Sequence, residues 1–144
     1  MLSELTANEA VLTAVHYLVY FALWPIVLVF IIAFIRVGKV ITAGASPDDF
    51  PSGVKHGSDP YWRLNRAHMN IFESLPIFAV MVFGGIATGA IDDQFALLCR
   101  IALAARIVQT LAHLSSGSVL AVNVRFLGLG VQLVCFILMA LAIL

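Results

Sequence analysis

The sequence predicts an all-α integral membrane protein whose protomer is a bundle of four transmembrane helices. Of its 144 residues, 62% are hydrophobic and only 11% are charged, whereas soluble domains are roughly half apolar and a quarter charged. A bilayer core about 30 Å thick needs roughly 20 apolar helical residues for each crossing, and the chain contains four such stretches. Open strands are excluded as spans because they would leave unpaired backbone amides in lipid.

The first span is expected at about residues 11–35, a stretch without any charged side chain. It is too long for the core of a secretory signal peptide, and no Lys or Arg precedes it, so we interpret it as a retained span. The long connection that follows carries TAGASPDDFPSGVKHGSDPYW. Its Gly, Ser, Pro and Asp residues are typical of turns. Two interpretations remain open: a cover over a site at the membrane surface, and an unstructured linker.

Three further apolar stretches follow this connection. They are expected to span the membrane at about 71–91, 95–114 and 124–144. Together the four spans leave almost no residues for a soluble domain, so residues 1–144 are predicted to form a single transmembrane domain. Cys99 and Cys135 lie inside apolar segments without a CxxC motif, and we expect both to be packing residues. No two histidines have metal-ligand spacing, so no metal site is predicted.

The distribution of charges predicts the orientation of the chain. Five cations flank or lie within the first connection, and one lies at the end of the third: Arg36, Lys39, Lys55, Arg63, Arg66 and Arg125. The opposite side carries Glu4, Glu9, Asp92 and Asp93. By the positive-inside rule, connections one and three face the cytoplasm, and the short loops favour a bacterial inner membrane. The net charge of zero gives no indication of a nucleic-acid partner.

Polar side chains follow one face of the second span. Arg66, Asn70 and Glu73 have spacings of i, i+4 and i+7, and Arg63 lies at the edge of the same stripe. Each helical residue advances by about 100°, so these side chains share one face.

The third span carries a similar stripe. Arg106, Gln109 and His113 have spacings of i, i+3 and i+7. Because consecutive spans are antiparallel neighbours, we expect the two polar stripes to meet.

A charged side chain at the centre of a membrane helix costs about 2.5–3.5 kcal/mol. One interpretation is structural: Glu73 and Arg106 neutralise each other, while Asn70 and Gln109 hydrogen-bond between helices. The other is a ligand site. Guanidiniums suit the two-point binding of carboxylates, and the carboxylate of Glu73 suits an ammonium. Glutathione carries these groups, as do other zwitterions and lipid headgroups. The candidate cations are Arg63, Arg66, Arg106 and Arg125.

The motif RAHMNIFESLPIF, the segment LAARIVQTLAHL and the loop sequence SPDDF resemble those of the MAPEG family, membrane-associated proteins in eicosanoid and glutathione metabolism. The resemblance covers nearly the whole chain. It implies four-helix protomers assembled as homotrimers, with glutathione bound at protomer interfaces near the cytoplasmic side. It also implies which residues bind glutathione: Arg66, Asn70, Glu73, Arg106, Gln109 and His113. Several relatives carry Tyr where this chain has His113, and the position of Gln109 varies between aromatic and imidazole side chains.

The resemblance further implies that Arg125, near the start of the fourth span, favours the thiolate of glutathione. Thiolate is the nucleophile, and a free thiol has a pKa of about 8.5. A hydrogen bond from Ser116 or Ser118 to the sulfur is the alternative that the residues leave open.

The resulting prediction is a glutathione transferase that acts on hydrophobic electrophiles from the bilayer. Glutathione peroxidase activity is included in this prediction as a second activity. A non-enzymatic lipid-binding or scaffold protein is the main alternative, because the five-lipoxygenase-activating member of the family has no catalytic role. That member lacks the arginine and glutamate that this chain keeps as Arg66 and Glu73. A third alternative is a proton or solute carrier that uses Glu73 and His113, which requires water on both sides of the membrane.

Overall fold

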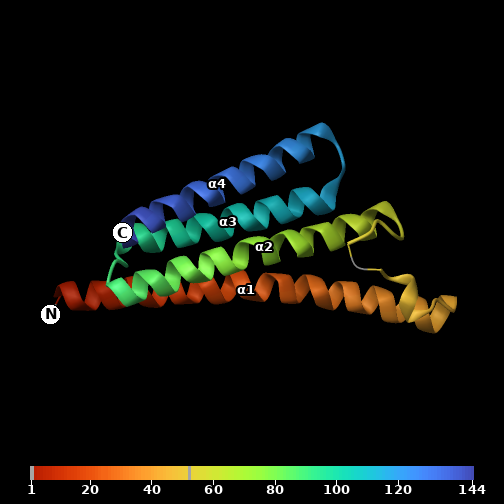
Figure 1. Ribbon diagram of the computed structural model, residues 1–144, viewed down its shortest axis with the longest axis horizontal. Coiled ribbons are helices and arrows are strands. Elements are labelled where there is room, and N and C mark those ends of the chain that lie inside the picture. Colours follow the sequence, from red (N-terminus) through yellow and green to blue (C-terminus); the bar gives the residue numbers. More distant parts are fainter. Residues whose placement is uncertain (1, 52) are drawn as a thin grey trace.

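A computed structural model shows long helices that run antiparallel to one another (Figure 1). It describes the backbone of residues 2–51 and 53–144 and the side chains of residues 8–51 and 53–144, so Glu4, used above for orientation, lies outside the described side chains. The elements are α1 (Leu2–Ala43), the 3-10 helix η1 (Pro47–Asp49), α2 (Asp59–Thr88), α3 (Asp93–Ser115) and α4 (Val119–Ile143). Within this part of the chain, four helices are long and apolar enough to cross a membrane. The predicted all-helical fold class with four membrane-spanning helices is confirmed.

The first two helices extend well beyond the apolar stretches that marked them. With 42 residues, α1 is about 63 Å long, roughly twice the thickness of the bilayer core. The helix α2 begins at Asp59, far before the expected span, with Ser58 as its N-cap and Pro60 in its first turn. Proline is well tolerated there because the first helical amides have no intrahelical partner. Hydropathy marks only the lipid-embedded part of a helix, and the polar turns continue outside it.

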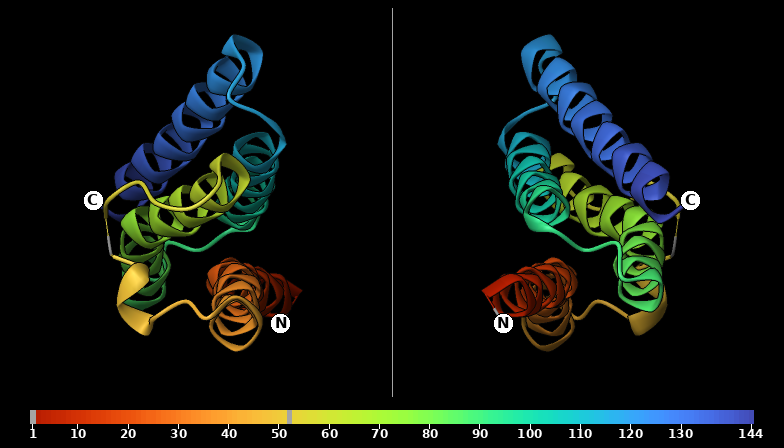
Figure 2. Two further views of the ribbon diagram at one scale, coloured as in Figure 1. Left: turned by 90° about the vertical axis from the view of Figure 1, so that its right-hand side faces the viewer. Right: turned by 90° about the vertical axis from the view of Figure 1, so that its left-hand side faces the viewer.

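The helix α3 lies at the centre of the bundle and packs against α1, α2 and α4. In both end views, α1 and α4 lie on opposite sides of the molecule (Figure 2). Aromatic rings connect the helices across the core: the centroid of Phe78 lies 5.1 Å from that of Phe21 and 5.7 Å from that of Phe136. Large apolar side chains such as Phe34 and Phe83 are exposed, as expected for surfaces that face lipid tails.

The two ends of the bundle differ in what they carry. Both termini and the α2–α3 connection lie at one end, and the α1–α2 and α3–α4 connections lie at the other (Figure 1). At the second end, Arg36 of α1 donates hydrogen bonds to the hydroxyl of Tyr61 (2.8 Å) and to the side-chain oxygen of Asn65 (3.3 Å) on α2. These bonds tie the extended parts of α1 and α2 together at the end that holds the polar stripes.

The contact between α3 and α4 depends on a glycine. A Cβ atom on Gly128 would lie 2.9 Å from the Cβ of Gln109 and 3.1 Å from the carbonyl oxygen of Ala105, whereas one on Gly130 would meet no atom within 4 Å. We therefore expect Gly128→Ala to destabilise the protein by about 1–3 kcal/mol through overpacking. The matched control, Gly130→Ala, should be neutral or stabilising because alanine favours helix. Thermal unfolding in detergent, followed by circular dichroism, measures both; equal melting temperatures would contradict the expectation.

Candidate functional site

Two adjoining cavities lie between α2 and α4, with α3 beneath them. The first has a volume of about 330 Å³ and is lined by Arg66, Asn70, Gln109, His113, Val122, Arg125, Phe126 and Leu129. The second has a volume of about 190 Å³ and is lined by Asn70, Glu73, Ser74, Ile77, Arg106, Gln109, Leu129, Leu133 and Phe136. Three residues line both cavities: Asn70, Gln109 and Leu129. The polar stripes of α2 and α3 therefore meet, and together they line one elongated recess.

Seven of the eight candidate site residues line this recess. The exception is Arg63, which is half-buried and lines neither cavity. The two loop serines also lie apart from it. The hydroxyls of Ser116 and Ser118 are 2.8 Å from each other, and Ser118 Oγ accepts a hydrogen bond from the amide of Ala121 as the N-cap of α4. Both serines thus serve the turn and the start of a helix.

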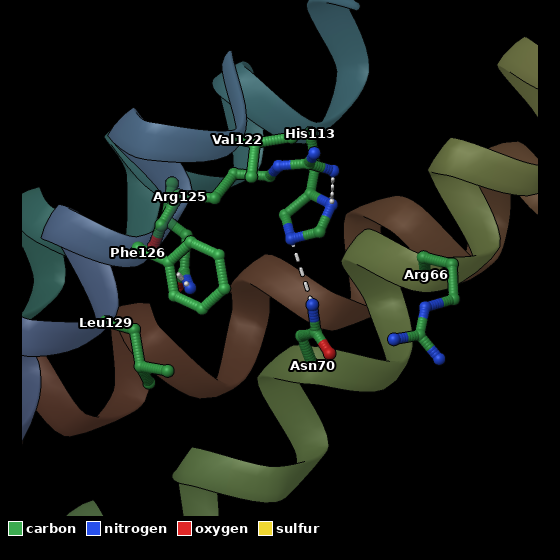
Figure 3. Close-up of a pocket in the computed structure, with 8 residues that line it drawn as sticks. Arg66, Asn70, His113, Val122, Arg125, Phe126 and Leu129 are labelled. Atoms are coloured by element: carbon green, nitrogen blue, oxygen red, sulfur yellow. Dashed lines mark hydrogen bonds between the residues drawn. The ribbon is translucent and has the colours of Figure 1, made fainter. Parts of the chain in front are cut away.

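One imidazole connects three helices at the wider cavity. Figure 3 shows the ring of His113, from α3, between Arg125 of α4 and Asn70 of α2. Arg125 Nη1 lies 3.1 Å from His113 Nδ1, and the side-chain nitrogen Nδ2 of Asn70 lies 2.9 Å from His113 Nε2. His113 is only 8% exposed. The guanidinium of Arg125 is therefore held against a buried partner rather than left to move in solvent.

The narrower cavity contains a buried guanidinium with few partners. Arg106 is 2% exposed, and it donates from Nη2 to the hydroxyl oxygen of Ser74. Its Cζ lies 5.5 Å from the ring centroid of Phe21, while its Nε is buried without a hydrogen-bond partner. Glu73 lines the same cavity but is exposed.

This arrangement bears on the two interpretations of the buried charge. Glu73 and Arg106 form no salt bridge among the described residues, so the direct ion pair of the structural interpretation is not formed. Its other part is present, because Asn70 contacts His113 and Gln109 accepts from Gln132, each on a different helix. Ser74, which sequence reasoning missed, holds the guanidinium instead. It follows Asn70 by four residues on the same helical face, and that spacing was the available signal.

Gln132 is a second polar residue that sequence reasoning missed. Its side chain is fully buried, and its Nε2 donates to Gln109 Oε1 (3.0 Å) and to the carbonyl oxygen of Gly128 (2.8 Å). Gln109 Nε2 in turn donates to the carbonyl oxygen of Arg125 (3.1 Å). Because Gln132 follows Arg125 by two helical turns, the same spacing rule would have placed it on the site-facing side of α4. The network fixes the backbone from which Arg125 projects.

The charges that line the recess favour an anion. Three guanidiniums, those of Arg66, Arg106 and Arg125, face a single carboxylate, that of Glu73, which leaves a net formal charge of +2. Such charges are costly in a membrane protein unless water or a ligand compensates them. A ligand with several acidic groups and one ammonium matches these three guanidiniums and one carboxylate.

Residues 14–144 of the chain match the sequence model of the MAPEG family. The chain belongs to the MAPEG family. A search of curated proteins found no match.

Membership confirms the resemblance drawn from the motifs of the second and third spans. It places the chain among membrane proteins of eicosanoid and glutathione metabolism, and the four membrane-spanning helices agree with a multi-pass MAPEG protein. The MAPEG match begins within α1 and continues to the last residue, so it covers every residue that lines the recess.

Proposed function

We propose that this MAPEG protein is a membrane-embedded glutathione transferase. It conjugates the glutathione thiolate to hydrophobic electrophiles. Reduction of apolar hydroperoxides is a second proposed reaction, in which two glutathione molecules are oxidised to the disulfide while the hydroperoxide becomes an alcohol and water. The observation that carries the proposal is Arg106, a guanidinium buried to 2% exposure with an unpartnered Nε beside an open cavity. Unpaired buried charges are strongly unfavourable. Glu73 lines the same cavity but forms no salt bridge with Arg106, so this cation is open to an anionic ligand.

The two cavities suit the two ends of glutathione. In the narrower one, Arg106 and Glu73 present one cation and one anion, which match the α-carboxylate and the ammonium of the γ-glutamyl end. In the wider one, Arg66 and Arg125 present two cations, which match the glycyl carboxylate and the sulfur. With its thiol ionised, glutathione has a net charge of −2, the opposite of the charge of the recess.

The proposed chemistry needs no metal and no general base on the protein. Arg125 stabilises the thiolate, and the thiol proton leaves to water. The sulfur then forms a bond with the electrophilic carbon, and the leaving group departs with the bonding electron pair. The apolar side chains of Val122, Phe126 and Leu129 line the same cavity and accept the hydrophobic electrophile. Catalysis then rests on positioning and on stabilisation of negative charge.

Two charged side chains support a homotrimer as part of the proposal. Arg66 and Glu73 are exposed on α2, within a helix long and apolar enough to span the membrane. Lipid-facing charge at that depth is costly, and a neighbouring protomer over this face of α2 would cover it. Cross-linking in native membranes tests the proposed homotrimer, and cross-linked trimers are the expected product.

We further propose that the end with the α1–α2 and α3–α4 connections faces the cytoplasm of a bacterial inner membrane. The cations predict this orientation, and the cavities lie toward that end, where glutathione is available. Alkaline phosphatase fused after Leu144 should be active and green fluorescent protein at the same site dark. The reverse pattern would invert the orientation.

The proposed function is tested by conjugation of glutathione to a chloronitrobenzene in detergent, with a fatty-acid hydroperoxide as the peroxidase substrate. The purified protein should turn over, and Arg66→Ala should raise the KM for glutathione about tenfold or more through loss of a charge-assisted hydrogen bond. Saturable binding of an apolar ligand with no conjugation would instead support the scaffold alternative.

A further inference from the structure

We infer that His113 is a positioning residue: as a neutral imidazole it holds the guanidinium of Arg125 through Nδ1, and Asn70 fixes its tautomer. This inference rests on the proposed function, because it concerns how Arg125 comes to favour a thiolate. It assigns His113 a role that does not depend on contact with the ligand.

The donors and acceptors of the contact determine the state of the ring. A guanidinium has five N–H donors and no acceptor, so the 3.1 Å contact from Arg125 Nη1 requires a lone pair on His113 Nδ1. The imidazolium form has hydrogens on both nitrogens and would oppose one donor with another. His113 in this geometry is therefore neutral, with its hydrogen on Nε2.

Asn70 completes the arrangement from the opposite helix. Its side-chain nitrogen Nδ2 lies 2.9 Å from Nε2, whereas a protonated Nε2 needs an acceptor there. A half-turn of the planar amide about its last bond exchanges its nitrogen and oxygen, and it places the carbonyl oxygen at this position. Asn70 then accepts from Nε2–H, and this bond selects the tautomer whose Nδ1 faces Arg125.

The charges around the ring reinforce the neutral state. The charged groups that act on His113 are guanidiniums from three helices: Arg125 on α4, Arg66 on α2 and Arg106 on α3. The ring is also 92% shielded from solvent, since its exposed fraction is 8%. A second positive charge at this place would be opposed by all three guanidiniums.

Arg125 is therefore held at two points, its backbone carbonyl and its guanidinium. Gln109 donates to the carbonyl oxygen of Arg125, which anchors the backbone, and His113 accepts from one terminal nitrogen of the side chain. The remaining N–H groups stay free for a thiolate in the cavity that Arg125 lines. A preorganised donor stabilises developing charge better than a mobile one, because it needs no reorganisation during the reaction.

Two substitutions separate this role from a packing role. His113→Asn keeps an acceptor near the position of Nδ1 and does not titrate, whereas His113→Phe keeps an aromatic ring and loses the acceptor. In His113→Phe, the midpoint of thiolate formation by bound glutathione, followed by ultraviolet absorbance, should rise by about one pH unit. The kcat/KM at neutral pH should fall about tenfold or more, mainly through a lower kcat. His113→Asn should restore both values to within about threefold of the wild type.

Each outcome separates the inference from the proposed function. If the wild type binds no glutathione, the proposed function is overturned, and the inference that rests on it is overturned as well. If the wild type forms the thiolate and His113→Phe matches it, the inference alone is overturned. Equal impairment of both variants, with lowered melting temperatures, would assign His113 a merely structural role and would also overturn it.

A spectroscopic measurement tests the same inference without turnover. The chain has four histidines, so ¹⁵N-histidine labelling gives few signals, and His113→Asn identifies the one that belongs to His113. At neutral pH, Nδ1 of His113 should resonate as an unprotonated nitrogen and Nε2 as a protonated one. The opposite tautomer, or an imidazolium, would contradict the inference.

Discussion

Arg125→Ala is expected to lower the kcat/KM for glutathione conjugation by about 100-fold or more at neutral pH. Removal of one preorganised donor from a developing anion has effects of this size. Arg125 lines the wider cavity and is held there by His113 and Gln109. The loss should therefore appear mainly in kcat, while the Kd for glutathione, which depends on Arg66, Arg106 and Glu73 as well, should change much less.

The pH dependence identifies the cause of this loss. A free thiol has a pKa of about 8.5, and a neighbouring cation lowers the pH at which the bound thiol ionises. Rates of the wild type should thus reach their plateau at lower pH than rates of Arg125→Ala, and the gap should narrow in alkaline solution, where glutathione ionises without help. Arg125→Lys keeps the positive charge but loses the planar set of guanidinium donors, so its rates should lie between those of the wild type and Arg125→Ala. A gap of constant size at all pH values would show that Arg125 does not act on the thiol.

Arg106→Met is expected to stabilise the glutathione-free protein and to abolish glutathione binding. A buried cation with one hydroxyl partner and an unpartnered Nε is a cost to the folded state that an apolar side chain of similar length removes. Such replacements often stabilise proteins by about 1–4 kcal/mol. The same change deletes the cation proposed to bind the γ-glutamyl carboxylate, so affinity should fall by about 100-fold. Melting temperature and equilibrium dialysis measure the two effects.

The matched control for this substitution lies on the same helix. Arg100 is exposed, and its Cζ lies 6.0 Å from the ring centroid of Tyr17, away from both cavities. Arg100→Met should leave glutathione affinity unchanged. Glutathione should raise the melting temperature of the wild type and of Arg100→Met, but not that of Arg106→Met. If Arg106→Met were less stable than the wild type but bound glutathione normally, Arg106 would have a structural role only.

Sequence patterns predicted the parts of this molecule that depend on one helix at a time. Apolar stretches long enough to cross a bilayer predicted the spanning helices, and the 100° advance per residue predicted that Arg66, Asn70 and Glu73 share a face. The start of α2 at Asp59 was not predicted, because its first turns are polar and hydropathy does not report on helix formed in water.

These patterns predicted that two polar stripes meet, but they did not predict the individual side-chain contacts between helices. Arg106 pairs with Ser74 rather than with Glu73 because the axial register and rotation of α2 against α3 determine which side chain it meets. Those quantities follow from packing, such as the close approach of α4 at Gly128. Gln132 shows a related limit. It has no side-chain partner in its own helix, and its side-chain contact appears only once Gln109 lies opposite it.

The most direct test of the central claim is equilibrium dialysis of labelled glutathione against the purified wild-type protein in detergent. The account predicts saturable binding that glutathione sulfonate displaces and cysteinylglycine, which lacks the γ-glutamyl end, does not. Absence of saturable binding at millimolar glutathione, or equal displacement by cysteinylglycine, would contradict the claim that this recess and its buried Arg106 are built to hold the tripeptide.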